Sequence, residues 1–305
     1  MSLVVRPLAL GPPGPLVTPD PAAERRLREL AMDPERGPDP RARLVAEQDG
    51  QTVGWARVDV LHSQLHSLIE LGLVGEVDPL EHGAALIRAM LPLFAGGRLE
   101  AALWHRHSPP WTHALLSRPL PEGAFELYIE KLYVRRSLED FRSPYPVSFA
   151  LVSLEDAGEA AFIEALGAAL SGSPARDLRA TDPVFEFSEM RALEGDTHEP
   201  DWWKIALLDG EPAGVILGNR FAGDDDEGTF TFIGLSERLR GRGLGPPLHA
   251  LGLELLAERG VRRYLCSTDV RNTPMLRLYA KHGCQPFDIR RQYLWRPAPA
   301  ATDGR

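Results

Sequence analysis

The stretch from Ile233 to Gly260 reads IGLSERLRGRGLGPPLHALGLELLAERG and carries a cluster of glycines and arginines between two patterned segments. The segment before the cluster, TFTFIGL from Thr229 to Leu235, is β-branched and aromatic, which predicts a strand. After the cluster, apolar residues recur at helical spacing from Leu248, and Gly260 is typical of a helix end. The sequence therefore predicts a strand, a glycine-rich loop and a helix.

A glycine-rich loop in this setting suits an anion. It directs several backbone N–H groups into one concavity at the positive end of the helix dipole, and glycine removes the side chains that would block a phosphate. The loop matches neither the Walker pattern, which ends in Gly-Lys-Ser/Thr, nor the Rossmann pattern. A flexible basic turn is the alternative, but the strand before and the helix after the loop favour a phosphate site.

The six residues of the loop, RGRGLG, resemble the Arg/Gln-x-x-Gly-x-Gly/Ala pyrophosphate loop of the GCN5-related N-acetyltransferases (GNAT). Downstream, DVRNTPMLRLYAKHGC from Asp269 to Cys284 is similar to that family's next segment, in which Asn leads into a helix bearing Leu-Tyr. The resemblance implies acetyl-coenzyme A (acetyl-CoA) as the co-substrate. The coenzyme contacts that it implies are Ile233, Leu235, Arg240, Gly241, Arg242, Gly243, Leu244, Gly245 and Asn272.

A weak internal repeat suggests two copies of one fold. LVAEQDGQTVGWARV from Leu44 and WKIALLDGEPAGVIL from Trp203 both have the form of a β-hairpin around an Asp-Gly pair. The segment RSLEDFRSPYP from Arg136 to Pro146 has the composition of a connector. We therefore place an N-terminal domain at residues 1–143, a C-terminal domain at 144–298 and a disordered tail at 299–305.

The resemblance extends to tandem, mycothiol synthase-like members of the family. It implies two GNAT-like domains, each a mixed α/β fold with a twisted, largely antiparallel sheet and helices on both faces. In the first half, the loop that corresponds to the glycine cluster begins at Asp78 and reads DPLEHGAALIRAML, with one glycine and two carboxylates. This composition suits a pyrophosphate poorly, so we expect the N-terminal copy to be degenerate.

Amide formation from a thioester needs three groups. A base takes a proton from the amine, donors stabilise the carbonyl oxygen, and an acid protonates the thiolate. The resemblance implies Tyr279 as the acid, although a tyrosine at that helical spacing also suits a core position. It implies Glu227 as the base, against the alternative that the run from Asp224 to Glu227 is a solvated loop. Asp269 is the reserve base, and a backbone N–H near Leu235 is the expected oxyanion donor.

Composition limits the partners. The chain has 305 residues and a net charge of −9, which opposes general binding to nucleic acid or to an anionic membrane. No run of apolar residues is long enough for a membrane span, and two cysteines are too few for a disulfide framework. We expect a cytoplasmic monomer or homodimer without a metal.

The expected function is acetyl-CoA-dependent N-acetylation of a primary amine on a small molecule or peptide, by direct transfer in a ternary complex. The alternative is a non-catalytic acyl-CoA-binding or partner-binding module that keeps the phosphate loop. The residues that would bind the acceptor follow no recognisable code.

Overall fold

The computed structural model divides the chain into two compact units. One, the N-terminal unit, contains Met1–Glu130 together with Arg290–Arg305, and the other, the C-terminal unit, contains Lys131–Ile289. The structure describes residues 3–8, 43–62, 65–94, 98–106, 108–146, 149–174, 182–221 and 223–299. Apart from Pro299, the tail expected at 299–305 lies outside the described residues.

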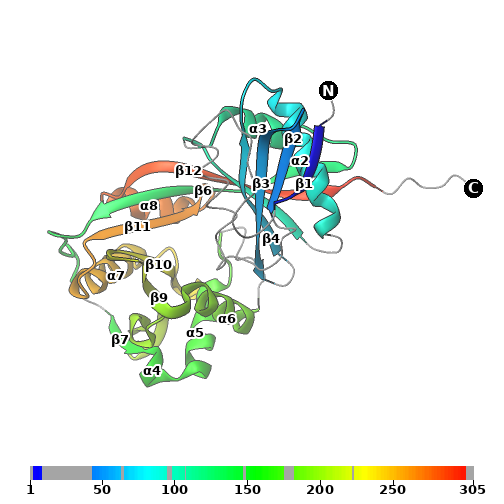
Figure 1. Cartoon of the computed structure of the whole chain (residues 1–305). Coiled ribbons are helices and arrows are strands. Elements are labelled where there is room, and N and C mark those ends of the chain that lie inside the picture. Colours follow the sequence, from blue (N-terminus) through cyan, green and yellow to red (C-terminus); the bar gives the residue numbers. More distant parts are fainter. Residues whose placement is uncertain are drawn as a thin grey trace, which may run out of the picture. The chain divides into compact units, whose positions relative to one another are not determined.

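Among the described residues, each half of the sequence contributes six strands, most of which are labelled in Figure 1. The elements of the first half are β1 (Leu3–Pro7), β2 (Arg43–Gln48), β3 (Gln51–His62), β4 (Leu65–Leu73), α2 (Pro79–Met90), η2 (Leu91–Phe94), β5 (Arg98–Trp104), α3 (Pro110–Leu116) and β6 (Gly123–Ser137). Those of the second half are β7 (Ala150–Ser153), α4 (Leu154–Ala157), α5 (Glu159–Leu170), α6 (Pro183–Glu194), η4 (Gly195–Thr197), η5 (Pro200–Trp202), β8 (Trp203–Leu208), β9 (Glu211–Phe221), β10 (Asp224–Leu235), η6 (Glu237–Leu239), α7 (Gly245–Glu258), β11 (Arg263–Asp269), α8 (Thr273–Lys281) and β12 (Gln285–Pro297).

Both predicted hairpins form. β2 pairs antiparallel with β3, and β8 pairs antiparallel with β9. The turns are Asp49-Gly50 and Asp209-Gly210, in which all four residues have positive φ. This is the backbone geometry that a two-residue hairpin turn requires and that Asp-Gly adopts readily. The repeat read from the sequence is thus a repeat of structure.

The last strand of each sequence half pairs with the fifth strand of the other half. Residues Lys131–Ser137 of β6 run antiparallel to β11, and residues Arg290–Leu294 of β12 run antiparallel to β5. The compact units therefore divide inside β6 and inside β12. The boundary expected between residues 143 and 144 follows the two sequence halves, whereas the contacts follow the exchanged strands.

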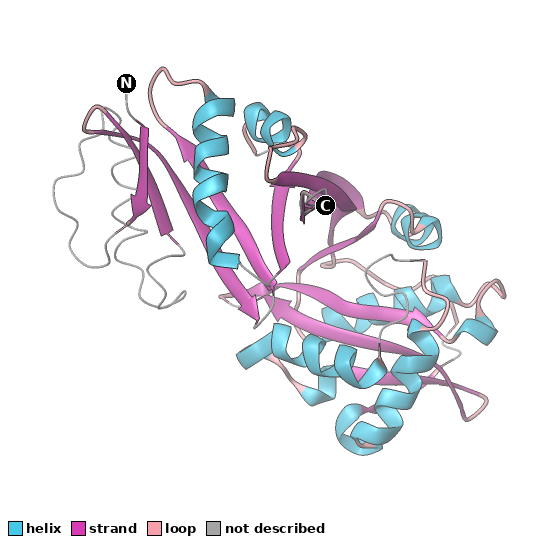
Figure 2. Cartoon of the chain, turned by 90° about the vertical axis from the view of Figure 1, so that its right-hand side faces the viewer, coloured by secondary structure: helices cyan, strands magenta, loops and turns pink. Residues whose placement is uncertain are grey.

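The sheet of the C-terminal unit carries helices on both faces (Figure 2). Its strand order is β12-β6-β11-β10-β9-β8-β7. α7 packs on one face, where Gly252 approaches the Phe230 ring, and α5 packs on the other, where the backbone of Ala169 approaches Gly234. The core centres on fully buried Trp203, which stacks on Phe162.

The described strand pairings are antiparallel, except those of β4 with β5 and of β10 with β11. The prediction of a mixed α/β fold with largely antiparallel sheets is confirmed. Within the described ranges, no helix is long and apolar enough to cross a membrane.

Candidate functional site

The parallel strands β10 and β11 pair only where they begin. Glu227 lies opposite Arg263 and Gly228 lies opposite Tyr264, and no pairing joins the strands beyond that point. On their other sides β10 continues along β9, and β11 continues along β6. The strands therefore separate, and the backbone groups on their facing edges have no strand partner. Such edges can bind an extended ligand that carries amide groups.

β10 has a bulge just after the strands separate. Its register with β9 shifts between Phe230 and Phe232, so Thr231 is the extra residue. On the other edge, the Cys266 thiol of β11 lies 3.7 Å from the carbonyl oxygen of Phe230. Bulges re-aim side chains and release backbone groups, and they are common beside active sites.

The glycine-rich loop follows β10 and η6. Gly241 and Gly243 have φ values of +74° and +76°, and a Cβ atom at either position would meet no atom within 4 Å. The backbone N–H groups of residues 241–245 donate to no carbonyl among the described residues. Glycine is thus needed for the backbone, and the loop presents a run of free donors.

α7 begins at Gly245 without a side-chain cap. Its N-cap residue, Leu244, offers no acceptor to the first turn, and Pro246 and Pro247 supply no N–H groups. The free donors of the loop therefore lie at the positive end of a 14-residue helix. This combination is suited to a pyrophosphate.

The Arg240 side chain, expected to contact the coenzyme, is turned toward the protein. Its guanidinium donates to the carbonyl oxygen of Leu235 at 3.2 Å and to that of Ala169 at 2.6 Å. Burial lowers the pKa of Arg240. This side chain anchors the loop to β10 and to the end of α5. The side chain of Arg242, in contrast, is exposed and lies in the loop itself.

Asn272 caps α8. Its Oδ1 accepts from the Met275 N–H at 3.3 Å, and its Nδ2 donates to Thr268 Oγ1 at 3.0 Å. The amide therefore joins the end of β11 to the first turn of α8. In this way Asn272 fixes the helix that carries Tyr279.

Tyr279 of α8 is 2% exposed. It lies beside Cys266, and its ring centroid is 5.9 Å from that of His249. Among the described residues no group meets its hydroxyl at hydrogen-bonding distance and angle, although the side chains of Cys266 and Tyr264 lie close enough to affect its pKa. Burial raises the pKa of Tyr279 well above its usual value, so the hydroxyl keeps its proton at neutral pH. The structure thus places an unpartnered proton donor beside the edge of β11.

Glu227 lies at the paired end of β10. Its carboxylate accepts from Arg263 Nε at 3.1 Å, and its side chain is 31% exposed. The neighbouring Asp224 binds the same guanidinium at 2.8 Å. Thr231 lies four positions after Glu227, roughly 13 Å along a strand. The acidic run is therefore joined to the start of β11.

A buried cluster on the α5 and α6 side of the sheet carries a carboxylate that the sequence reading passed over. Glu194, at the end of α6, accepts from the Thr231 hydroxyl and, at 3.0 Å, from Trp203 Nε1. Its Oε2 lies 2.8 Å from Nδ1 of His198. Burial raises the pKa of Glu194, while the three hydrogen bonds oppose that shift. The sequence hints at this cluster only through the positions of Glu194 and His198, which are four apart.

Two histidines form a buried pair behind Tyr279. Nδ1 of His249 lies 2.7 Å from Nδ1 of His282, and the rings are stacked. Burial, followed by the charge of His282, lowers the pKa of His249 to about 3. Burial, followed by the charge of Arg136, lowers the pKa of His282 to about 4. Both rings are therefore neutral in the folded protein near pH 7.

We expect this pair to make the protein sensitive to acid. The unfolded chain protonates both histidines near pH 6.5, whereas the folded chain does so only near pH 3 to 4. The contribution of the neutral pair to the free energy of unfolding is therefore fully present above pH 6.5. It falls as the pH drops, by up to about 1.4 kcal/mol per pH unit for each histidine. Thermal melting between pH 7 and 4 measures this, and His249→Phe should flatten the curve. If the pH dependence of melting in His249→Phe matched that of the wild type, the role of the pair would be contradicted. His105→Gln, at an exposed position, is the control and should keep the wild-type pH dependence.

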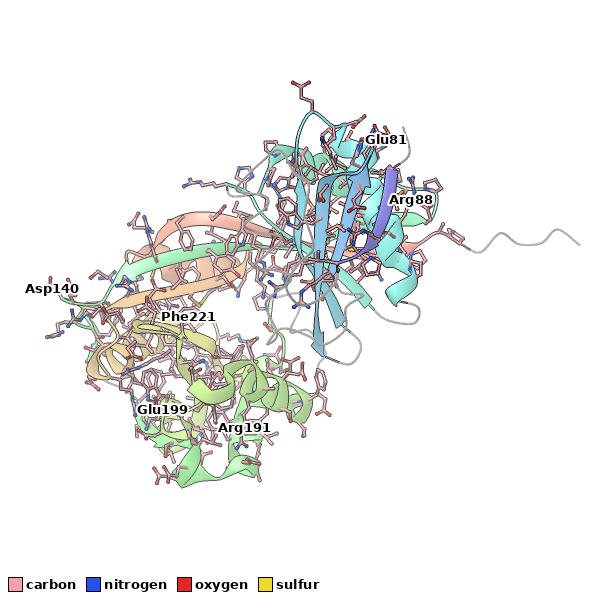
Figure 3. All side chains as sticks on the ribbon, in the orientation of Figure 1. Glu81, Arg88, Asp140, Arg191, Glu199 and Phe221 are labelled. Atoms are coloured by element: carbon pink, nitrogen blue, oxygen red, sulfur yellow. The ribbon has the colours of Figure 1, made fainter. Side chains whose placement is uncertain are left out.

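The corresponding helix of the N-terminal unit, α2, begins differently. The Asp78 carboxylate accepts from the N–H groups of Leu80 at 2.8 Å and Glu81 at 3.3 Å. Glu81 adds a second negative charge in the first turn, and Arg88 lies in the last turn (Figure 3). The protein's own carboxylate therefore occupies the donors that α7 leaves free.

Comparison with known proteins gives a consistent result. Residues 169–284 match the acetyltransferase (GNAT) family. The mycothiol acetyltransferase of Nocardia farcinica is 28% identical over 264 residues, which cover 81% of this chain and 80% of that protein. A GCN5-related N-acetyltransferase structure from Sphaerobacter thermophilus aligns with 90% of this chain and 85% of its own, at a TM-score of 0.60 and 18% identity. A tandem GNAT protein from the clavulanic acid biosynthesis pathway aligns with 98% of this chain and 100% of its own, at a TM-score of 0.55 and 17% identity. The tandem fold is thus shared with solved structures.

Proposed function

We propose that this chain, of which residues 169–284 match the acetyltransferase (GNAT) family, transfers the acetyl group of acetyl-CoA to the primary amine of a small molecule. The observation that carries the proposal is the loop 241–245. Its five N–H groups have no acceptor among the described residues, and they precede an uncapped helix. A pyrophosphate needs these features, whereas a structural turn would satisfy its own donors.

The separated strands support the rest of the coenzyme site. The edge of β10 toward Leu235 leads from the bulge at Thr231 to the phosphate loop. Its unpaired backbone groups suit the amides of a pantetheine arm, which would bind as a further strand. Acetyl-CoA supplies an activated acyl group, a thioester.

We assign the proton transfer to sulfur and the stabilisation of the carbonyl oxygen to two groups beside this edge. The Tyr279 hydroxyl, buried and protonated, would donate its proton to the thiolate sulfur. A backbone N–H of β10 near the bulge would stabilise the negative charge on the carbonyl oxygen. Direct transfer needs no acyl-enzyme, so both substrates would bind together.

We propose a small amine as the acceptor because the Nocardia farcinica relative, which matches over 264 residues, is named a mycothiol acetyltransferase. A non-catalytic acyl-CoA-binding module remains the competing function, since a free phosphate loop alone would serve it equally well. Thiol release from acetyl-CoA in the presence of a panel of primary amines separates the two. Amine-dependent release supports the transferase, and coenzyme binding without such release would support the binding module.

We expect one molecule of acetyl-CoA per chain. The N-terminal unit caps its corresponding helix with Asp78, so a phosphate there would meet a carboxylate rather than free donors. Calorimetric titration should give a stoichiometry of one, unchanged by Glu81→Gln. Two sites of similar affinity would show that the N-terminal copy is intact.

A further inference from the structure

A pocket of about 670 Å³ lies between α5 and α6 in the C-terminal unit. Ile163 of α5 and Val184 and Phe187 of α6 form its apolar wall, and Ser188 adds a hydroxyl. Arg191 lies on the same helix (Figure 3), and its guanidinium is 2.7 Å from a carboxylate oxygen of Glu159. Both charges of that pair are exposed, so they neutralise each other at the rim. Polar and apolar groups share the lining of the pocket about equally.

His198 is a titratable group of this pocket. Its side chain is 8% exposed, and its Nε2 is buried without a hydrogen-bond partner among the described residues. Nδ1 faces the Glu194 carboxylate, which can only accept, so Nδ1 carries the proton and Nε2 keeps its lone pair. A carboxylate that fixes the tautomer of a histidine in this way prepares the other nitrogen to take a proton.

Glu194 also joins the pocket to the strand edge. The carboxylate that holds His198 accepts the hydroxyl of Thr231, the bulge residue of β10. The rear of the carboxylate is closed by Trp203, whose indole N–H donates to both of its oxygens. With three donors bound, Glu194 has little capacity left to take a proton from a substrate. The free nitrogen of His198 has that capacity.

We propose that His198 is the general base of the transfer, that Glu194 is its positioning residue, and that the pocket between α5 and α6 binds the acceptor amine. This inference rests on the proposed function. The acceptor ammonium gives one proton to Nε2 of His198, which releases it to solvent. The nitrogen–carbon bond to the acetyl group forms, the carbon–sulfur bond breaks, and the Tyr279 hydroxyl proton goes to sulfur. The second nitrogen proton leaves to solvent, from which Tyr279 regains its own.

The lining of the pocket also indicates the substrate class. Ile163, Val184 and Phe187 offer apolar surface, and Glu159, the one carboxylate among the described lining residues, is paired with Arg191. The acceptor is therefore a primary amine whose carbon skeleton packs on that apolar wall. A polyamine would find no unpaired carboxylate among these residues for its further ammonium groups.

The test measures amine-dependent thiol release with 2-phenylethylamine and with the best acceptor of the amine panel. We expect His198→Gln to lower kcat by about 10²- to 10⁴-fold, with acetyl-CoA affinity unchanged by calorimetry. Glu194→Gln keeps the size of the side chain and removes the negative charge that holds the His198 tautomer, so kcat should fall while acetyl-CoA affinity stays unchanged, and Glu194→Asp should restore part of the loss. A structural role alone would not separate kcat from coenzyme affinity in this way. Ala192→Trp, at an exposed position that lines the pocket, should raise KM for the amine and leave coenzyme affinity intact.

Glu227→Gln tests the assignment made from the sequence. Loss of turnover in Glu227→Gln together with wild-type turnover in His198→Gln would overturn our proposal. Wild-type KM in Ala192→Trp would remove the acceptor from this pocket. Absence of release from the wild-type protein with every amine would instead contradict the proposed function. Preference for polyamines would refute the substrate class alone.

Discussion

The Gly243→Glu variant is expected to lose acetyl-CoA affinity by at least about a hundredfold while the protein stays folded. The side chain would enter the open space that the loop leaves around Gly243, where a Cβ atom meets nothing within 4 Å. A carboxylate there would oppose the phosphates of the coenzyme, and like charges in contact cost several kcal/mol, of which about 1.4 kcal/mol corresponds to each factor of ten. Calorimetric titration measures the affinity, and thermal melting checks the fold.

Two further variants separate charge from backbone strain. Gly243→Ala brings the strain of a φ of +76° without the charge, so it should weaken binding far less. Gly210→Glu places the same side chain at a φ of +84° in the hairpin turn of the same unit, with open space around it. We expect Gly210→Glu to bind acetyl-CoA as the wild type does. Equal affinity in Gly243→Glu and Gly210→Glu would disprove the coenzyme loop.

For Tyr279→Phe we expect a fall in turnover of between about 10² and 10⁴, with acetyl-CoA affinity nearly unchanged. The substitution keeps the buried ring and removes the one hydroxyl that we assign to the departing sulfur. Because a thiol is a moderate leaving group even as the thiolate, the low end of the range is the expected value. Single-turnover kinetics with a working amine measures the effect on the chemical step.

The structure supplies an internal control for this variant. The Tyr279 hydroxyl is buried without a partner, and such a group costs stability rather than adding to it. The melting temperature of Tyr279→Phe should therefore equal or exceed that of the wild type. A normal turnover would reduce Tyr279 to a core residue, and weaker coenzyme binding would make it a binding residue.

The glycine-rich loop was the part of the site most readable from the sequence. Positive φ at Gly241 and Gly243 is a local requirement, and the strand and the helix on either side have their own periodicity. The hairpin turns at Asp49 and Asp209 are local for the same reason. In each case the residue type and the backbone conformation that it allows lie within a few positions of one another.

Contacts between distant residues could not be read in that way. Glu194 meets Thr231 across 37 positions of sequence, and no motif marks either residue. The Arg240 side chain has the identity that the loop pattern asks for, yet it binds the carbonyl oxygen of Ala169. The exchange of β6 and β12 depends on which edges meet, because an antiparallel strand of the same composition can pair with either half.

The exchanged strands bear on how a first copy without a coenzyme would persist in evolution. A carboxylate at the first-half helix terminus, such as that of Asp78, would oppose a phosphate there and leave the pairing of β6 with β11 untouched. Deletion of the first half would instead leave β11 with an open edge on the side that β6 covers, and open edges promote aggregation. Selection for the activity of the second half therefore also preserves the first half, because its strand β6 covers the edge of β11. This holds whether or not the first half binds a ligand of its own.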